Sequence, residues 1–124
     1  MLNACEPMAF VATTQPEKAK AFYSGVLGLT LDLEDQFMMV FRAGPIRLMI
    51  QKVQQFTPQP FTVLGWRVPD IKSMNAQLAS RGVKFERYKG MEQDAAGIWS
   101  VPGGGQVCWF KDPDGNTLSL TQSR

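Results

Sequence analysis

Acid–base and metal chemistry would have to proceed without histidine in this protein, because none of its 124 residues is a histidine. This absence excludes histidine general bases, serine–histidine–aspartate triads and metal sites that contain histidine. A general base would have to be a carboxylate, a lysine, a tyrosine or a cysteine. No two carboxylates have a spacing that requires them to converge, and we identify no catalytic residue. The carboxylates expected in turns or near strand ends are Glu34, Asp35, Glu86, Glu92 and Asp94.

The two cysteines, Cys5 and Cys108, are too few for a disulfide framework and form no CxxC motif for zinc or redox chemistry. We expect both to be reduced thiols, with Cys108 inside a strand. The run Gly103–Gly105 is not a phosphate-binding loop, because neither a lysine–serine or lysine–threonine pair nor a helix follows it. It predicts the flexible tip of a hairpin.

The composition is typical of one globular domain. Hydrophobic residues make up 44% of the chain and charged residues 19%, which suits a packed core. The net charge is +2 and the charges are scattered, so the electrostatic pattern of a nucleic-acid-binding protein is absent. The N-terminus does not resemble a secretory signal, and no apolar run is long enough to span a membrane. We expect a cytoplasmic protein with neither a nucleic-acid nor a membrane partner.

The first half of the chain has the pattern of one strand, one helix and three further strands. An apolar run at 8–13 predicts the first strand. The segment Thr14–Glu17 (TQPE) has the pattern of a capping box with proline in the first helical turn, and Gly28 is placed to end the helix. Short strands are then expected at about 29–33, 37–42 and 46–53.

The second half repeats this order. A strand is expected at 61–68, followed by a helix with Asp70 as its N-cap and Gly82 at its end. The segment Asp112–Asn116 (DPDGN) predicts a turn between the last two strands. The strands expected after the helix lie at about 83–87, 98–101, 106–111 and 116–121.

The two halves match at an offset of about 54–55 residues, since Met8 corresponds to Val63 and Gly28 to Gly82. The sequence therefore predicts an α+β fold of two tandem βαβββ modules within a single domain of residues 1–124. Module one covers about 7–54 and module two about 60–122.

Alternation within the strands separates two faces of the predicted sheet. One face is aliphatic, as in Leu48, Ile50 and Leu118, and is expected to pack under the helices. The other mixes Met, Gly, Ser, Thr, Gln and Arg, which suits a concave surface lined for a ligand. The alternative is a sheet face that is exposed to solvent. The apolar side chains on this face argue against that alternative; they are Met8, Phe10, Met49 and Trp109.

Two motifs resemble the vicinal-oxygen-chelate superfamily, which includes glyoxalase, bleomycin-resistance and extradiol-dioxygenase proteins. The first is the helical segment Glu17–Leu29, with its FYxxVLGL pattern, and the second is Phe110–Asn116, with its DPDGN hairpin. The resemblance extends from about Met8 to Gln122. It implies paired βαβββ modules that form a curved mixed sheet around a cavity, with the helices on the outer face, and it implies a homodimer.

The resemblance also implies four strand positions that hold a divalent metal in most enzymes of the superfamily. Here they correspond to Met8, Gln51, Val63 and Ser119. A methionine thioether is too soft for such a site, valine has no donor atom and serine is a poor neutral ligand. We therefore expect the cavity without the metal, and no cofactor.

The residues expected to bind a ligand share the mixed face or lie beside it. Counting outward from the DPDGN turn places Trp109 opposite Ser119, although a register slip would exchange Trp109 with Cys108 or Phe110. Trp99 could form a wall or lid, and Met38 or Met39 could join the floor. The arginines could attract an anionic ligand or be solvated strand ends. The full set is Met8, Phe10, Arg47, Met49, Gln51, Val63, Gly65, Arg67, Trp99, Trp109 and Ser119.

These features predict a metal-free protein of the glyoxalase and bleomycin-resistance type that binds a small molecule. The ligand would be apolar or aromatic, and the arginines would also accept an anionic one. The alternative is a lyase, isomerase or dioxygenase-like enzyme that uses a displaced metal or a carboxylate base. A third is a structural or regulatory dimer. A homodimer would cover the edge strands of two such small modules.

Overall fold

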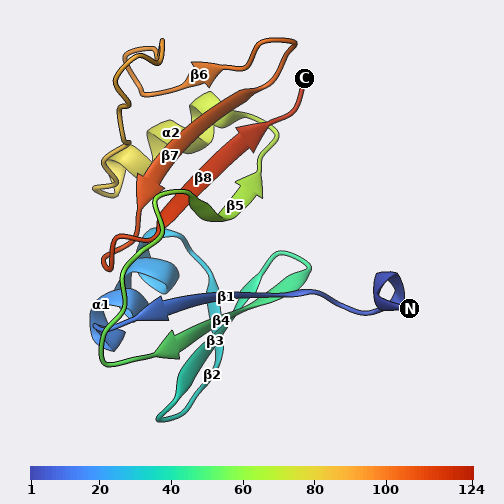
Figure 1. The fold of residues 1–124 in the computed structure, drawn as a ribbon, viewed down its shortest axis with the longest axis vertical. Coiled ribbons are helices and arrows are strands. Elements are labelled where there is room, and N and C mark those ends of the chain that lie inside the picture. The colour runs from blue at the N-terminus through green and yellow to red at the C-terminus, as the bar shows by residue number, and fades with distance from the viewer. The chain divides into compact units, whose positions relative to one another are not determined.

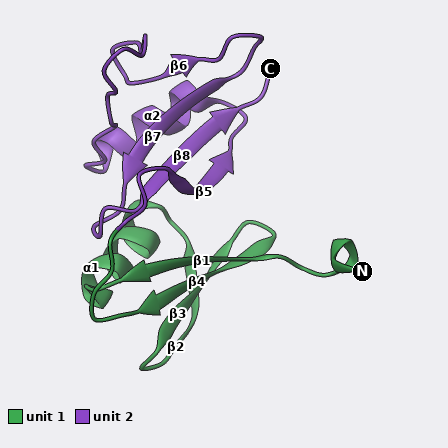
Figure 2. Ribbon diagram, viewed as in Figure 1, with its two compact units in different colours: residues 1–57 green, residues 58–124 purple.

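The computed structural model describes residues 1–124 and divides them into two compact units, residues 1–57 and 58–124 (Figure 2). Each unit contains its own four-stranded sheet and one α-helix, and each is described by itself. The fold class is α+β with two tandem modules, as the sequence predicts. The strands form two separate ladders rather than one continuous sheet.

Unit 1 is a mixed sheet with the strand order β1-β4-β3-β2 (Figure 1). Strands β1 and β4 are parallel, and the other neighbours are antiparallel. A short 3₁₀ helix, Leu2–Ala4, precedes the sheet. The elements that follow are β1 (Met8–Thr13), α1 (Pro16–Lys20), a π-helical continuation (Ala21–Val26), β2 (Thr30–Glu34), β3 (Met38–Ala43) and β4 (Ile46–Lys52).

Unit 2 has the corresponding strand order, β5-β8-β7-β6, with β5 parallel to β8. Figure 1 shows α2 on one side of this sheet. The elements are β5 (Thr62–Arg67), α2 (Ile71–Ser80), β6 (Trp99–Ser100), β7 (Gln106–Lys111) and β8 (Thr117–Gln122). None of the helices in either unit has the length and apolar character that crossing a membrane requires.

The strand predicted at 83–87 is absent, and this prediction was wrong. The alternation in the sequence is nevertheless real, because Phe85 packs against Phe110 with ring centroids 5.6 Å apart. Only one backbone hydrogen bond joins the segment to β7, from the Glu86 N–H to the Trp109 carbonyl at 2.8 Å. The place beside the start of β7 is taken by β6, which has only two residues.

The observed ends of the helices agree in part with those predicted from the sequence. Asp70 is the N-cap of α2, and its carboxylate accepts a hydrogen bond from the Ser73 N–H at 3.1 Å. The N-cap of α1 is Gln15, one residue later than the predicted capping box requires, and its side chain makes no capping bond. Gly28 and Gly82 follow the two helical segments with φ of 75° and 93°, a conformation that favours glycine.

The core of each unit lies between its helix and the aliphatic face of its sheet. In unit 1, Tyr23 from the π-helical turn is fully buried and lies 6.0 Å from the ring of Phe41 on β3. In unit 2, the Asn75 amide on α2 contacts the Cys108 sulfur on β7 at 3.6 Å. The predicted aliphatic face is buried, including Leu48, Ile50, Leu64, Leu118 and Leu120.

The DPDGN segment forms the predicted turn between β7 and β8. The buried Asp112 carboxylate accepts hydrogen bonds from the backbone N–H groups of Asp114 and Asn116, each at 2.9 Å, and from the Asn116 side chain at 2.8 Å. Asp112 thus serves as a turn residue, and these bonds help to fix the register of the hairpin.

Glu34 connects three elements of unit 1. Its two carboxylate oxygens lie 2.6 Å from the Lys20 ammonium on α1 and 2.8 Å from the Lys52 ammonium on β4. The hydrogen bond from Lys20, followed by that from Lys52, holds the pKa of Glu34 below its ordinary value. These contacts give Glu34 a structural role.

The lowered pKa of Glu34 predicts a pH-dependent contribution to stability. Such a carboxylate stabilises the fold above its unfolded-state pKa, and the contribution disappears as the pH falls through the folded-state pKa. Glu34→Gln should therefore lower the urea midpoint at neutral pH, and the difference from wild type should shrink on acidification. Glu17→Gln is the control, since Glu17 is 86% exposed and lies 3.7 Å from Lys20. A pH-independent difference for Glu34→Gln would contradict this assignment.

Candidate functional site

A row of three residues crosses the face of the unit 2 sheet that points away from α2. Trp109 on β7 pairs with Ser119 on β8, and Ser119 pairs with Gly65 on β5. The predicted pairing of Trp109 with Ser119 is confirmed. Cys108 lies on the opposite face, against α2, as its contact with Asn75 shows.

Position 65 requires glycine because Ser119 on the neighbouring strand lies very close to it. A Cβ atom built at Gly65 would lie 2.5 Å from the Ser119 Oγ atom, much closer than two such atoms can approach. Ser119 is 7% exposed. A bare backbone on β5 therefore leaves room for the Ser119 hydroxyl beside it.

Three aromatic rings gather at the β6 side of this row. The Trp99 and Trp109 rings lie 6.2 Å apart with their planes tilted by 31°, and the Tyr88 ring meets Trp109 edge-on at 5.4 Å. We call Tyr88, Trp99 and Trp109 the aromatic group. Aromatic rings in such arrangements present large flat surfaces that suit stacking with a planar ligand.

The loop of residues 86–98 carries Tyr88 and leads into Trp99, and side-chain hydrogen bonds of Gln93 hold this loop together. The Gln93 side-chain amide donates to the carbonyls of Glu86 at 2.9 Å and Gly97 at 2.8 Å. Its carbonyl oxygen accepts from the Tyr88 N–H at 2.7 Å. Its backbone also forms an isolated bridge with Trp99. One side chain therefore ties the segment before Tyr88 to the segment before Trp99.

Two further side chains brace the same loop. Arg87 donates to the backbone carbonyls of Gln93 at 3.0 Å and Asp94 at 2.8 Å. The Asp94 carboxylate accepts from the backbone N–H groups of Ala96 and Ile98, each at 2.9 Å. The loop lacks regular secondary structure, yet many of its backbone polar groups have partners.

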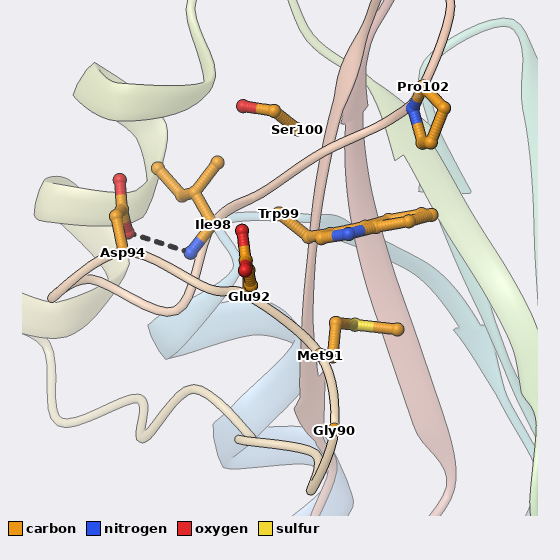
Figure 3. A pocket seen from close by; sticks show the side chains of 8 residues that line it. All are labelled: Gly90, Met91, Glu92, Asp94, Ile98, Trp99, Ser100 and Pro102. Carbon is orange, nitrogen blue, oxygen red and sulfur yellow. Dashed lines mark hydrogen bonds between the residues drawn. The ribbon is translucent and has the colours of Figure 1, made fainter.

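A pocket of about 630 Å³ opens between this loop and β6 (Figure 3). It has the size of a small-molecule site. In Figure 3 the side chains of Met91 and Trp99 extend in the same direction along it. Its lining consists of Gly90, Met91, Glu92, Asp94, Ile98, Trp99, Ser100 and Pro102.

Sequence reasoning found Trp99 but missed Tyr88 and Met91 as parts of this site. Both follow the segment that was predicted as a strand, where no periodicity indicates which way a side chain points. The sequence signal available was the presence of large apolar side chains in a region rich in glycine and charge.

The candidates of unit 1 lie on the face of its sheet that points away from α1. Phe10 pairs with Met49, and Met8 pairs with Arg47. Phe10 and Met8 are about half exposed, at 49% and 48%. Of the two methionines considered, Met38 pairs with Gln51, whereas Met39 is fully buried.

The two candidate arginines belong to different units, and each lines a pocket of its own. Arg47 on β4 is the cross-strand partner of Arg42 on β3. Both line a pocket of about 220 Å³ that Glu6 also lines. Arg67 lines a pocket of about 410 Å³ together with residues such as Gln122. Neither arginine lines the pocket beside Trp99.

The four positions that hold a metal in related enzymes do not suit one here. Met8 and Gln51 belong to unit 1, while Val63 and Ser119 belong to unit 2. A thioether, an amide, a hydrocarbon and a hydroxyl lack the charged or imidazole ligands that a divalent cation needs. Neither unit contains a group of three or more His, Cys, Asp or Glu side chains that could hold a metal ion.

Comparison with known proteins agrees with the fold. The family described as Glyoxalase/Bleomycin resistance protein/Dioxygenase superfamily matches residues 7–120. Among curated proteins, none matches the chain.

Several solved structures are similar over nearly the whole chain. A member of the same superfamily from Sphaerobacter thermophilus has a TM-score of 0.77 and 22% identity, over 99% of this chain and 100% of that one. A lactoylglutathione lyase from Agrobacterium tumefaciens has a TM-score of 0.73 and 15% identity, over 93% and 90%. A glyoxalase/bleomycin resistance protein/dioxygenase from Alicyclobacillus acidocaldarius has a TM-score of 0.70 and 14% identity, over 95% and 90%. At these identities the likeness shows the fold alone.

The contact between Gly65 and Ser119 predicts a compensating pair of substitutions. Gly65→Ala should lower the free energy of unfolding by about 1–3 kcal/mol, because the new methyl group overlaps the Ser119 hydroxyl. Adding Ser119→Ala removes that oxygen and should restore most of the loss. Urea denaturation of the single and double variants measures both effects. A double variant no more stable than Gly65→Ala would contradict the proposed close approach.

Proposed function

Because the chain belongs to the Glyoxalase/Bleomycin resistance protein/Dioxygenase superfamily, we propose that it binds a small apolar or aromatic molecule without using a metal ion. The observation that carries this proposal is the aromatic group beside the pocket of about 630 Å³. The ligand would lie on the sheet face that bears Trp109 and Ser119 and extend toward Trp99.

The side chains available at this place favour a flat or apolar ligand body. Trp99 and Trp109 supply ring faces, and such contacts add about 0.5–1.5 kcal/mol each beyond the burial of area. Met91 supplies a flexible thioether that adapts to ligands of different shape. Hydrogen bonds to backbone groups hold the loop that carries Tyr88 and leads into Trp99, which reduces the entropy lost on binding.

The donor atoms at the four family positions support binding without a metal. Val63 has no donor, and Met8 offers only a soft sulfur. Gln51 and Ser119 offer neutral oxygens, which hold a divalent cation poorly without a carboxylate beside them. An anionic ligand remains part of the proposal only where it would reach Arg47 or Arg67, which lie outside the pocket beside Trp99.

An enzyme of the lyase, isomerase or dioxygenase type is the second candidate. The observation that favours it is the position of Glu92, whose carboxylate shares the pocket with Trp99 and could act as a general base. Metal analysis of the purified protein, compared between wild type and Glu92→Ala, tests the version with a displaced metal. Bound metal that is lost in the variant would favour the enzyme over the binding protein.

A homodimer is also proposed. Large apolar side chains are exposed on the unit 1 sheet and in the turn between β2 and β3, among them Phe10 at 49%, Leu33 at 59% and Phe37 at 65%. Exposed apolar surface of this kind is common at interfaces between protein chains. Light scattering coupled to size exclusion gives the mass in solution, and a monomer at all concentrations would reject this proposal.

Substitutions in the aromatic group should weaken binding of a neutral aromatic probe. Quinaldine, titrated calorimetrically at about pH 8, should bind Trp99→Leu and Trp109→Leu about threefold to tenfold more weakly than wild type, because each loses one ring contact. The matched control is Trp66→Phe, since Trp66 lies on the opposite face of β5 from Gly65. Equal affinity in all four proteins would reject the proposed site.

A further inference from the structure

We infer that the pocket beside Trp99 selects organic cations, with the Trp99 ring and the Glu92 carboxylate, which both line it, as the groups that recognise the positive charge. The class of ligand is a planar or quaternary ammonium on an apolar body. This inference rests on the proposed function, to which it adds the charge of the ligand. It depends on the contacts of unit 2 alone.

The charged groups that line the pocket are all acidic. They are Glu92 and Asp94, and no lysine or arginine lines it. The Asp94 carboxylate already accepts two backbone hydrogen bonds within the loop, from Ala96 and Ile98. Asp94 therefore serves mainly to shape the loop, and Glu92 remains as the carboxylate available to a ligand.

Glu92 has no basic partner in the protein. The ion pairs of Lys20, Lys52 and Arg42 do not include it. The arginine nearest in sequence, Arg87, points its guanidinium at the backbone carbonyls of Gln93 and Asp94 instead. Glu92 is exposed and no ion pair to a basic side chain involves its carboxylate, so the carboxylate is available to a cationic ligand.

The Trp99 ring provides the second half of the recognition. A cation over an indole face is attracted by the ring quadrupole, with about 0.5–2 kcal/mol according to how far it is desolvated. The apolar side chains of Met91 and Ile98 and the ring of Pro102 line the same pocket and suit the body of an organic cation. A small inorganic cation would gain little from these walls.

The geometry is fixed before a ligand binds. Trp99 pairs with Val107 on β7, and its own ring contacts Trp109. Gln93 joins the two ends of the loop through three side-chain hydrogen bonds. The Glu92 carboxylate would repel an anionic ligand in this preformed pocket. The pocket therefore discriminates between ligands by charge as well as by shape.

Three probes with the same bicyclic body but different charges test the inference. They are N-methylquinolinium, which is cationic, quinaldine, which is neutral at about pH 8, and quinaldate, which is anionic. We expect N-methylquinolinium to bind wild type about tenfold more tightly than quinaldine in calorimetric titrations, and quinaldate to bind most weakly. Added salt should reduce the preference for the cation.

The variants separate charge from the aromatic surface. Glu92→Gln should reduce the preference for N-methylquinolinium over quinaldine by about threefold to tenfold, because it weakens binding of the cation more than binding of the neutral probe. Glu86→Gln, which makes the same change in net charge at a residue outside the pocket, should leave the preference as in wild type. Trp99→Leu should weaken both probes.

The outcomes distinguish this inference from the function on which it rests. If quinaldine binds as tightly as N-methylquinolinium, or if Glu92→Gln and Glu86→Gln act alike, selection of cations is wrong while binding at the aromatic group stands. If none of the three probes depends on Trp99, the proposed function and the inference both fail.

Discussion

One helix can cover only one face of a four-stranded sheet, and the chemistry open to this protein depends on that constraint. In unit 2 the aliphatic side chains of Leu118 and Leu120 lie on the face that α2 covers and form part of the core. The opposite face carries Trp109, Ser119 and Gly65 in register. No helix of unit 2 covers this second face, so polar, small and aromatic side chains can occupy it in place of aliphatic ones.

The part of the site that the sequence could predict is the part built on regular strands. The Asp112 turn sets the hairpin register, and period-two alternation then places Trp109 opposite Ser119. The loop of residues 86–98 could not be predicted in this way. Its shape comes from side-chain bonds of Gln93 and Arg87 to backbone groups, which leave no periodic trace in the sequence. Tyr88 was missed for that reason.

The alternation at 83–87 shows why a correct pattern can predict the wrong element. Phe85 is indeed turned toward Phe110, as an inward strand residue would be. A strand also needs a ladder of backbone bonds, and here the Glu86 N–H supplies the single bond to β7. Burial of alternate side chains thus fixes the path of the chain, while the choice between strand and loop is decided by which groups satisfy the backbone.

The two-residue length of β6 has a consequence for how the protein behaves at high concentration. A long exposed edge would offer β7 as a template for a strand from another molecule. Here β6 covers only residues 106 and 107, and the loop bonded through Glu86 lies against the edge at Trp109. The stretch of β7 that another strand could pair with is therefore short, because the irregular segment that shapes the pocket occupies part of this edge.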